Sequence, residues 1–209
     1  MEGYLRLFPL NLVAFPGEEL NLHIFEDRYK QLVEECLTQQ ISFGIPSYVH
    51  AALEFGTEVK IKQLVRKYED GRMDISTEAT RVFKVKSFEN PVKGKLYAGG
   101  EVEFQDNIYD IDIGHHHQMV ELLREFYAAL HLDQEIHVAE DAMSFHIAHK
   151  IGLSLEEEYE LLKLPRESER QTFVVVHLKK AIPLLREIER TKQLIQMNGH
   201  FKHFDKLDY

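Results

Sequence analysis

The N-terminal segment constrains the fold more than any other part of the chain, because it reads as strand, turn, strand and helix in succession. An apolar run over residues 5–13 ends at Pro16-Gly17, a pair that favours a turn since proline fixes φ and glycine accepts a positive φ. Residues 20–24 then alternate between apolar and polar, which is the period of a half-buried strand. Apolar side chains, beginning with Phe25, follow at helical spacing and predict a helix over residues 26–38 that buries one stripe.

The stretch that follows contains only short strand candidates. Strands are predicted at residues 41–49, 57–65, 72–77, 80–88 and 96–104. Asp70-Gly71 is the signal of a tight hairpin, because this pair readily supplies the positive φ of a type I′ turn. About six short strands around one helix predict an α+β fold that starts with a small closed or partly open barrel rather than a parallel sheet.

After residue 106 the pattern changes from strands to helices. Helices are predicted around residues 119–130, at 138–151, from Ser154 to just before Pro165, and from about 167 to 197. Ser154 and Glu157 spell a capping box at the start of the third helix. Pro183 is expected to kink or split the last helix, and Asn198-Gly199 is expected to stop it.

These patterns predict two subdomains and a tail. A β-barrel is expected over residues 1–108, an α-helical bundle over 109–199 and a C-terminal tail over 200–209.

Charge and composition narrow the classes of function. The 209 residues carry 35 acidic and 25 basic side chains, a net charge of −10. Nucleic-acid affinity comes largely from Lys and Arg displacing counterions, so this charge disfavours RNA or DNA as a partner. No apolar run approaches the roughly 20 residues of a membrane helix, and the N-terminus lacks the pattern of a signal peptide. A single cysteine, Cys36, fits a reducing compartment, so we expect a cytoplasmic protein without a membrane partner.

Several motifs resemble the N-terminal, substrate-binding domain of Lon proteases. They are Phe8-Pro-Leu10, Val13-Ala-Phe-Pro-Gly17, Leu20-Asn-Leu-His-Ile-Phe-Glu-Asp-Arg-Tyr29, Gly56-Thr-Glu-Val-Lys-Ile61, Asp70-Gly-Arg-Met-Asp-Ile-Ser76 and Thr80-Arg-Val-Phe83. The resemblance implies a PUA-like β-barrel followed by an α-helical bundle, in a short Lon-domain protein that captures unfolded or tagged polypeptides.

The motifs of the Lon motor and peptidase do not occur in this sequence. An ATPase loop is spelled Gly-x-x-x-x-Gly-Lys-Ser/Thr, and no such string is present. No residue matches the context of the family's Ser-Lys peptidase dyad. We therefore expect a noncatalytic protein that needs no cofactor. Its expected partners are unfolded or specific client polypeptides, with a protease or chaperone as a further candidate to which clients are delivered.

Four aromatic residues near turns or strand ends are the candidate peptide-binding side chains: Tyr48, Phe55, Tyr68 and Tyr97. Partly exposed aromatic rings suit a module that grips unfolded segments, whereas the alternative role for the same rings is to cap the barrel core. Addition of a peptide to an open strand edge is another mode that such a fold allows. An RNA-binding PUA-like module and a small-molecule hydrolase with a pocket between barrel and helices stay open as alternative functions.

The histidines and aspartates do not complete a metal-site pattern. His115-His-His117, and the pair His146 and His149, have spacings that two imidazole ligands can use, but no acidic or cysteine motif supplies the remaining ligands. The aspartates at residues 106–112 lack the spacing of a calcium loop. We expect no metal, and we expect Cys36 to be a buried thiol that packs as a small apolar side chain.

Overall fold

The computed structural model describes residues 1–49, 53–132 and 143–201. The chain forms two compact units, each built from two separated parts of the sequence. The first, here called the barrel unit, comprises Met1–Asp110 and Ala139–Arg170, and the second, here called the helical unit, comprises Ile111–Val138 and Gln171–Tyr209. Residues 143–170, part of the segment predicted as a helical bundle, therefore belong to the barrel unit.

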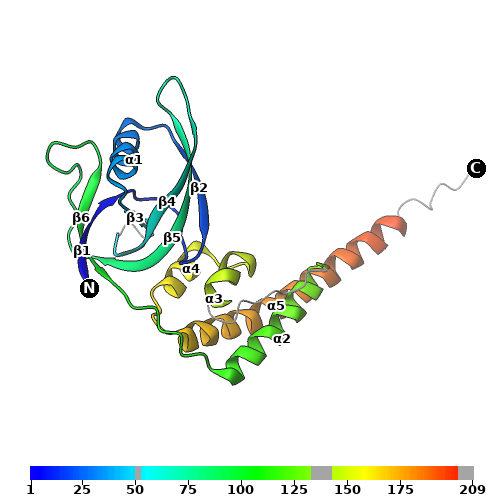
Figure 1. Ribbon diagram of the computed structural model, residues 1–209. Coiled ribbons are helices and arrows are strands. Elements are labelled where there is room, and N and C mark those ends of the chain that lie inside the picture. Colours follow the sequence, from blue (N-terminus) through cyan, green and yellow to red (C-terminus); the bar gives the residue numbers. More distant parts are fainter. Residues whose placement is uncertain (50–52, 133–142, 202–209) are drawn as a thin grey trace, which may run out of the picture. The chain divides into compact units, whose positions relative to one another are not determined.

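The barrel unit contains six strands (Figure 1). They are β1 (Glu2–Leu7), β2 (Glu19–Ile24), β3 (Phe43–Pro46), β4 (Phe55–Lys67), β5 (Met73–Val85) and β6 (Ala98–Phe104). Their order is β2-β5-β4-β3-β1-β6, and β5 also pairs with β6, so five strands close into a barrel while β2 lies beside β5 as an additional strand. Only β1 and β3 pair in parallel. The predicted α+β barrel fold is confirmed.

The two strands predicted at 72–77 and 80–88 are one strand, β5. Thr77 and Ala79 are both buried, so the alternation continues across the polar residues that suggested a break. Three register shifts in the β4–β5 ladder bend the pair without ending it. The hairpin predicted at Asp70-Gly71 is confirmed, with the Tyr68 N–H donating to the Arg72 carbonyl at 2.9 Å. Its turn is not the predicted type I′, because that type needs a positive φ at both central residues and only Gly71 of the pair has one, at +83°.

Helix α1 (Asp27–Gln39) covers the main core of the barrel unit and confirms the predicted helix. Its buried stripe consists of Tyr29, Leu32, Val33 and Cys36. These side chains belong to one cluster with strand residues that include Phe43, Ile45, Val59, Met73 and Ile75. The predicted burial of Cys36 is confirmed.

Two short helical segments and one further helix complete the barrel unit. They are α3 (Met143–Ile147), the 3-10 turn η1 (Ala148–Lys150) and α4 (Leu155–Leu162). The capping box of α4 is confirmed, because the Glu157 N–H donates to Ser154 Oγ and the Ser154 N–H donates to the Glu157 carboxylate. The helix predicted at 138–151 is present only as α3 and η1 in the part that the structure describes, and its first residues lie outside that part.

The helical unit contains α2 (Ile113–Ala129) and most of α5 (Glu167–Phe201). Helix α5 continues through Pro183 and past Asn198-Gly199. Of the predicted kink or split at Pro183, the split is wrong, and the predicted stop at Asn198-Gly199 is wrong as well. Leu178 and Ile182 are buried in the turn before the proline and stabilise the helical conformation there. An Asn-Gly pair costs only about 1–2 kcal/mol in a helix, which disfavours but does not forbid continuation. No helix among the described residues is long and apolar enough to span a membrane.

Candidate binding groove

An apolar groove lies beside the start of α1 in the barrel unit. It consists of two hollows of about 450 Å³ and 270 Å³ that share Pro9, Arg28 and Tyr29, and we name it the α1 groove. The larger hollow is also lined by Tyr48, Leu53, Phe88, Asn90 and Ala98. The smaller is also lined by Phe8, Leu10, Leu22, His23, Ile24, Phe25 and Glu26.

Of the residues shared by both hollows, Tyr29 is buried and packs on the core of the barrel unit. The ring of Tyr29 stacks on the buried ring of Phe8 with 3.7 Å between centroids, and burial raises the pKa of the Tyr29 hydroxyl. The Arg28 guanidinium lies over the Tyr29 ring at 4.5 Å and pairs with Glu26 at 2.7 Å. The Arg28 charge is therefore paired, and the other two shared residues, Pro9 and Tyr29, contribute largely apolar surface.

Large aromatic side chains along this groove remain exposed to solvent. Phe25 is 60% exposed, Tyr48 48% and Phe88 41%. Soluble proteins bury most such surface, and apolar surface gathered around a hollow marks a binding site. The arrangement suits a ligand that presents several apolar side chains to the groove at once.

The four aromatic residues predicted as a site lie in different surroundings. Tyr48 lines the α1 groove. Phe55 is half-buried and packs edge-on against Tyr159 of α4 at 6.3 Å. Tyr68 lies at the β4–β5 hairpin, where its hydroxyl donates to Asp74 at 2.8 Å.

Tyr97 differs most from the expectation of a partly exposed ring. It is only 2% exposed, because its ring packs in the core cluster under α1. Its hydroxyl donates to Glu35 at 2.6 Å and accepts from Arg6 Nε at 3.1 Å, which satisfies the polar end.

Sequence reasoning missed the exposed position of Phe25 and the contribution of Phe88. Phe25 was grouped with the buried stripe of the first helix, but the helix begins at Asp27 and Phe25 precedes its N-cap residue, Glu26. The available signal was Glu26-Asp27, acidic residues of the kind found at helix starts, which leaves the preceding phenylalanine outside the helix. Phe88 follows the end of β5, and its place beside Tyr48 depends on barrel closure.

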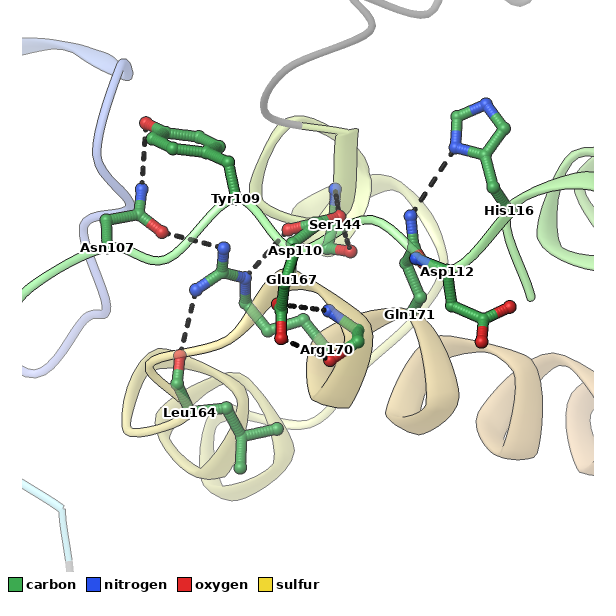
Figure 2. Close-up of polar contacts among 11 residues, drawn as sticks. Asn107, Tyr109, Asp110, Asp112, His116, Ser144, Leu164, Glu167, Arg170 and Gln171 are labelled. Atoms are coloured by element: carbon green, nitrogen blue, oxygen red, sulfur yellow. Dashed lines mark hydrogen bonds and ion pairs between the residues drawn. The ribbon is translucent and has the colours of Figure 1, made fainter. Parts of the chain in front are cut away.

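A further hollow of the barrel unit, about 280 Å³ and separate from the α1 groove, is lined by a buried arginine, Arg170. Figure 2 shows the polar contacts of this side chain. Arg170 is 1% exposed and donates to Glu167 at 2.9 Å, to the Leu164 carbonyl at 2.9 Å and to Asn107 Oδ1 at 2.7 Å. Glu167 also accepts from the Ser144 hydroxyl at 2.6 Å. The charged groups are satisfied by the protein itself, so this cluster is a structural element rather than a ligand site.

The candidate metal ligands of the sequence do not gather. In residues 1–49, 53–132 and 143–201, no three His, Cys, Asp or Glu side chains are placed to hold one metal ion. His149 instead bonds to Glu18 at 3.2 Å and to Glu158 at 2.7 Å, and these carboxylates raise its pKa to about 9. Burial raises the pKa of Cys36 to about 11, which excludes a thiolate nucleophile at neutral pH.

Comparison with known proteins assigns a family to this arrangement. The family model described as "ATP-dependent protease La (LON) substrate-binding domain" matches residues 4–180. The Lon N-terminal domain protein from Xanthomonas campestris is similar in structure with a TM-score of 0.67 and 25% identity, over 83% of this chain and 98% of that one. The N-terminal domain of a Mycobacterium avium complex Lon protease shows the same fold with a TM-score of 0.63 and 11% identity, over 85% and 98% of the two chains. No curated protein matches.

Proposed function

Because the chain belongs to the Lon substrate-binding domain family, we propose that it captures unfolded polypeptide segments in the α1 groove. The observation that carries this proposal is the set of exposed aromatic rings, Phe25, Tyr48 and Phe88, around a hollow with an apolar floor. The family domain is a noncatalytic substrate-binding module, and the described residues that line the groove include no nucleophile paired with a base.

The chemistry of the groove favours unfolded over folded clients. A folded protein buries most of its large apolar side chains, whereas an unfolded segment exposes them along the chain. Each apolar side chain that leaves water on binding contributes about 25 cal/mol per Å² of buried surface, so several rings acting together give useful affinity. The neutralised Arg28–Glu26 pair adds no preference for a charged client.

The direct test is a titration with a permanently unfolded protein, such as a reduced and alkylated model protein, followed by fluorescence anisotropy. Tyr48→Ala and Phe88→Ala should each weaken binding by about 5-fold or more, since truncating a ring at a hot spot costs at least about 1 kcal/mol. Tyr4→Ala is the matched control, because Tyr4 is 54% exposed and lies outside the α1 groove. No binding by the unaltered protein, or equal losses in all three variants, would contradict the proposal.

Delivery of the captured segment to a protease in the cytoplasm is the second part of this proposal. The support is membership of a family whose substrate-binding domains serve an ATP-dependent protease. In a reconstituted degradation assay with a partner protease recovered from the native cells, the protein should accelerate degradation of the same unfolded client. Phe88→Ala should remove the acceleration, and an equal rate with and without the protein would refute delivery.

A further inference from the structure

Strand β2 ends the sheet of the barrel unit with one open edge. Among the described residues it pairs with β5 alone, and it is not one of the five strands of the closed ring (Figure 1). Its six residues pair with β5 in unbroken register from Glu19↔Glu78 to Ile24↔Met73. The strand contains no proline and no lysine, and its ladder has no bulge. Soluble proteins commonly use those features to block an open edge, and β2 lacks all three of them.

The register shows which backbone groups point outward. The Ala79 N–H donates to the Glu18 carbonyl at 2.8 Å, and Thr77 Oγ1 donates to the Leu20 carbonyl at 3.1 Å. Residues 18 and 20 therefore turn their backbone groups toward β5. Because these directions alternate along an antiparallel strand, the N–H and C=O groups of Asn21 and His23 point to the open edge.

The smaller hollow of the α1 groove is lined both by this strand and by the segment that follows β1. Residues 22–24 and residues 8–10 both belong to its lining. The N–H groups of Phe8 and Leu10 donate to β3, at 2.8 Å to Gly44 and 3.1 Å to Pro46. Alternation turns Pro9 toward the hollow, and proline has no N–H to offer. Pro9 therefore offers no donor to an added strand, whereas His23 of β2 does.

We propose that a client segment binds to β2 as an added, extended strand, with alternate apolar side chains in the α1 groove. This mode of capture rests on the proposed function. Asn21 and His23 present paired donors and acceptors about 7 Å apart, which is the two-residue repeat of an extended chain. A helical client satisfies its own backbone groups and would leave this edge unpaired.

The charges at the groove indicate which side chains of the client it can accept. Glu26 and Arg28 both line the smaller hollow and neutralise each other at 2.7 Å, and the remaining lining is largely apolar. A charged client side chain would lose hydration there without gaining a partner. The occupant is therefore an extended segment with uncharged, bulky side chains at every second position.

Backbone N-methylation separates strand addition from simple apolar capture. The probes are a synthetic peptide with leucine or phenylalanine at alternate positions and two versions of it, N-methylated at every even or at every odd residue. Only one edge of the peptide faces β2, so one methylated version should bind at least 10-fold more weakly than the parent and the other within about 3-fold. Equal binding of all three peptides, or equal losses in both methylated versions, overturns strand addition while the groove proposal stands. Failure of the parent peptide to bind contradicts the proposed function itself.

Amide hydrogen exchange then locates the pairing on this chain. With the parent peptide bound, the Asn21 and His23 amides should exchange at least 10-fold more slowly. Leu20 and Leu22 are internal controls, because their amides already face β5 and should change little. Unchanged exchange at both Asn21 and His23 in the bound state would refute the proposal.

Discussion

Replacing His149 by glutamine removes one positive charge from the contact between η1 and the turn before β2. The imidazole lies 3.2 Å from a Glu18 carboxylate oxygen and 2.7 Å from a Glu158 oxygen. Hydrogen bonds to Glu18 and then to Glu158 raise its pKa from 6.5 to about 9. Glutamine keeps the size and a hydrogen-bond donor, so the variant isolates the charge.

The magnitude follows from linkage between protonation and folding. A rise from 6.5 to about 9 corresponds to at most about 3.4 kcal/mol, at 1.36 kcal/mol for each tenfold change in proton affinity. The side chain is 38% exposed, and solvent screening reduces this to about 1–2 kcal/mol. Because the pKa of the folded state is the higher one, the contribution is complete below pH 6.5 and disappears as the pH rises through 9.

Urea denaturation at pH 6, 7.5 and 10 measures this contribution. His149→Gln should lower the free energy of unfolding by about 1–2 kcal/mol at pH 6, by less at pH 7.5 and by almost nothing at pH 10. His117→Gln is the matched control for the substitution itself, because His117 is an exposed histidine on α2. A constant difference between His149→Gln and the unaltered protein at all three pH values would refute the linkage argument.

Three further predictions concern buried and capping groups. Arg170→Met leaves the Glu167 carboxylate buried without its cation and should cost about 3–5 kcal/mol in urea denaturation; a loss below 1 kcal/mol would contradict the argument. Ser154→Ala removes the capping oxygen of α4 and should cost about 1 kcal/mol, measured in the same way, whereas an unchanged midpoint would mean that the cap contributes nothing. Cys36 should react slowly with a thiol reagent in the native protein and at once in urea, because it is buried and its pKa is about 11; rapid native labelling would show that the core opens.

The features that the sequence predicted correctly depend on residues close together in the chain. The stripe of α1, the Asp70-Gly71 hairpin and the Ser154 capping box each require only one or two turns of backbone. The continuous β5 was missed because its partners, β2, β4 and β6, together decide where the strand ends. Polar residues in the middle of β5 remain part of the strand because backbone pairing with the neighbouring strands holds them there.

The candidate site was less predictable than the fold. Tyr48 was recognised as a candidate, yet its neighbours in the groove, such as Pro9, Arg28 and Phe88, come from distant parts of the chain. Aromatic residues combine a large apolar surface with a polar end, so a tyrosine near a turn suits the core and the surface equally well. Tyr97 is buried because Glu35 and Arg6 satisfy its hydroxyl, and these partners are 62 and 91 residues away.

The closed ring explains how this domain can leave apolar surface and a strand edge open. Closure of five strands leaves the ring itself with no free edge, and the core under α1 contains fully buried side chains such as Phe43, Ile45 and Val59. The exposed groove aromatics, Phe25, Tyr48 and Phe88, lie outside this ring, so changing them removes little of the buried surface that stabilises the fold. The floor of the groove serves both capture and stability, because Tyr29 belongs to the buried stripe of α1 and Ile24 of β2 is 1% exposed in the core cluster. The exposed aromatic side chains can change with the client, whereas the five closed strands and the buried stripe of α1 have to be maintained.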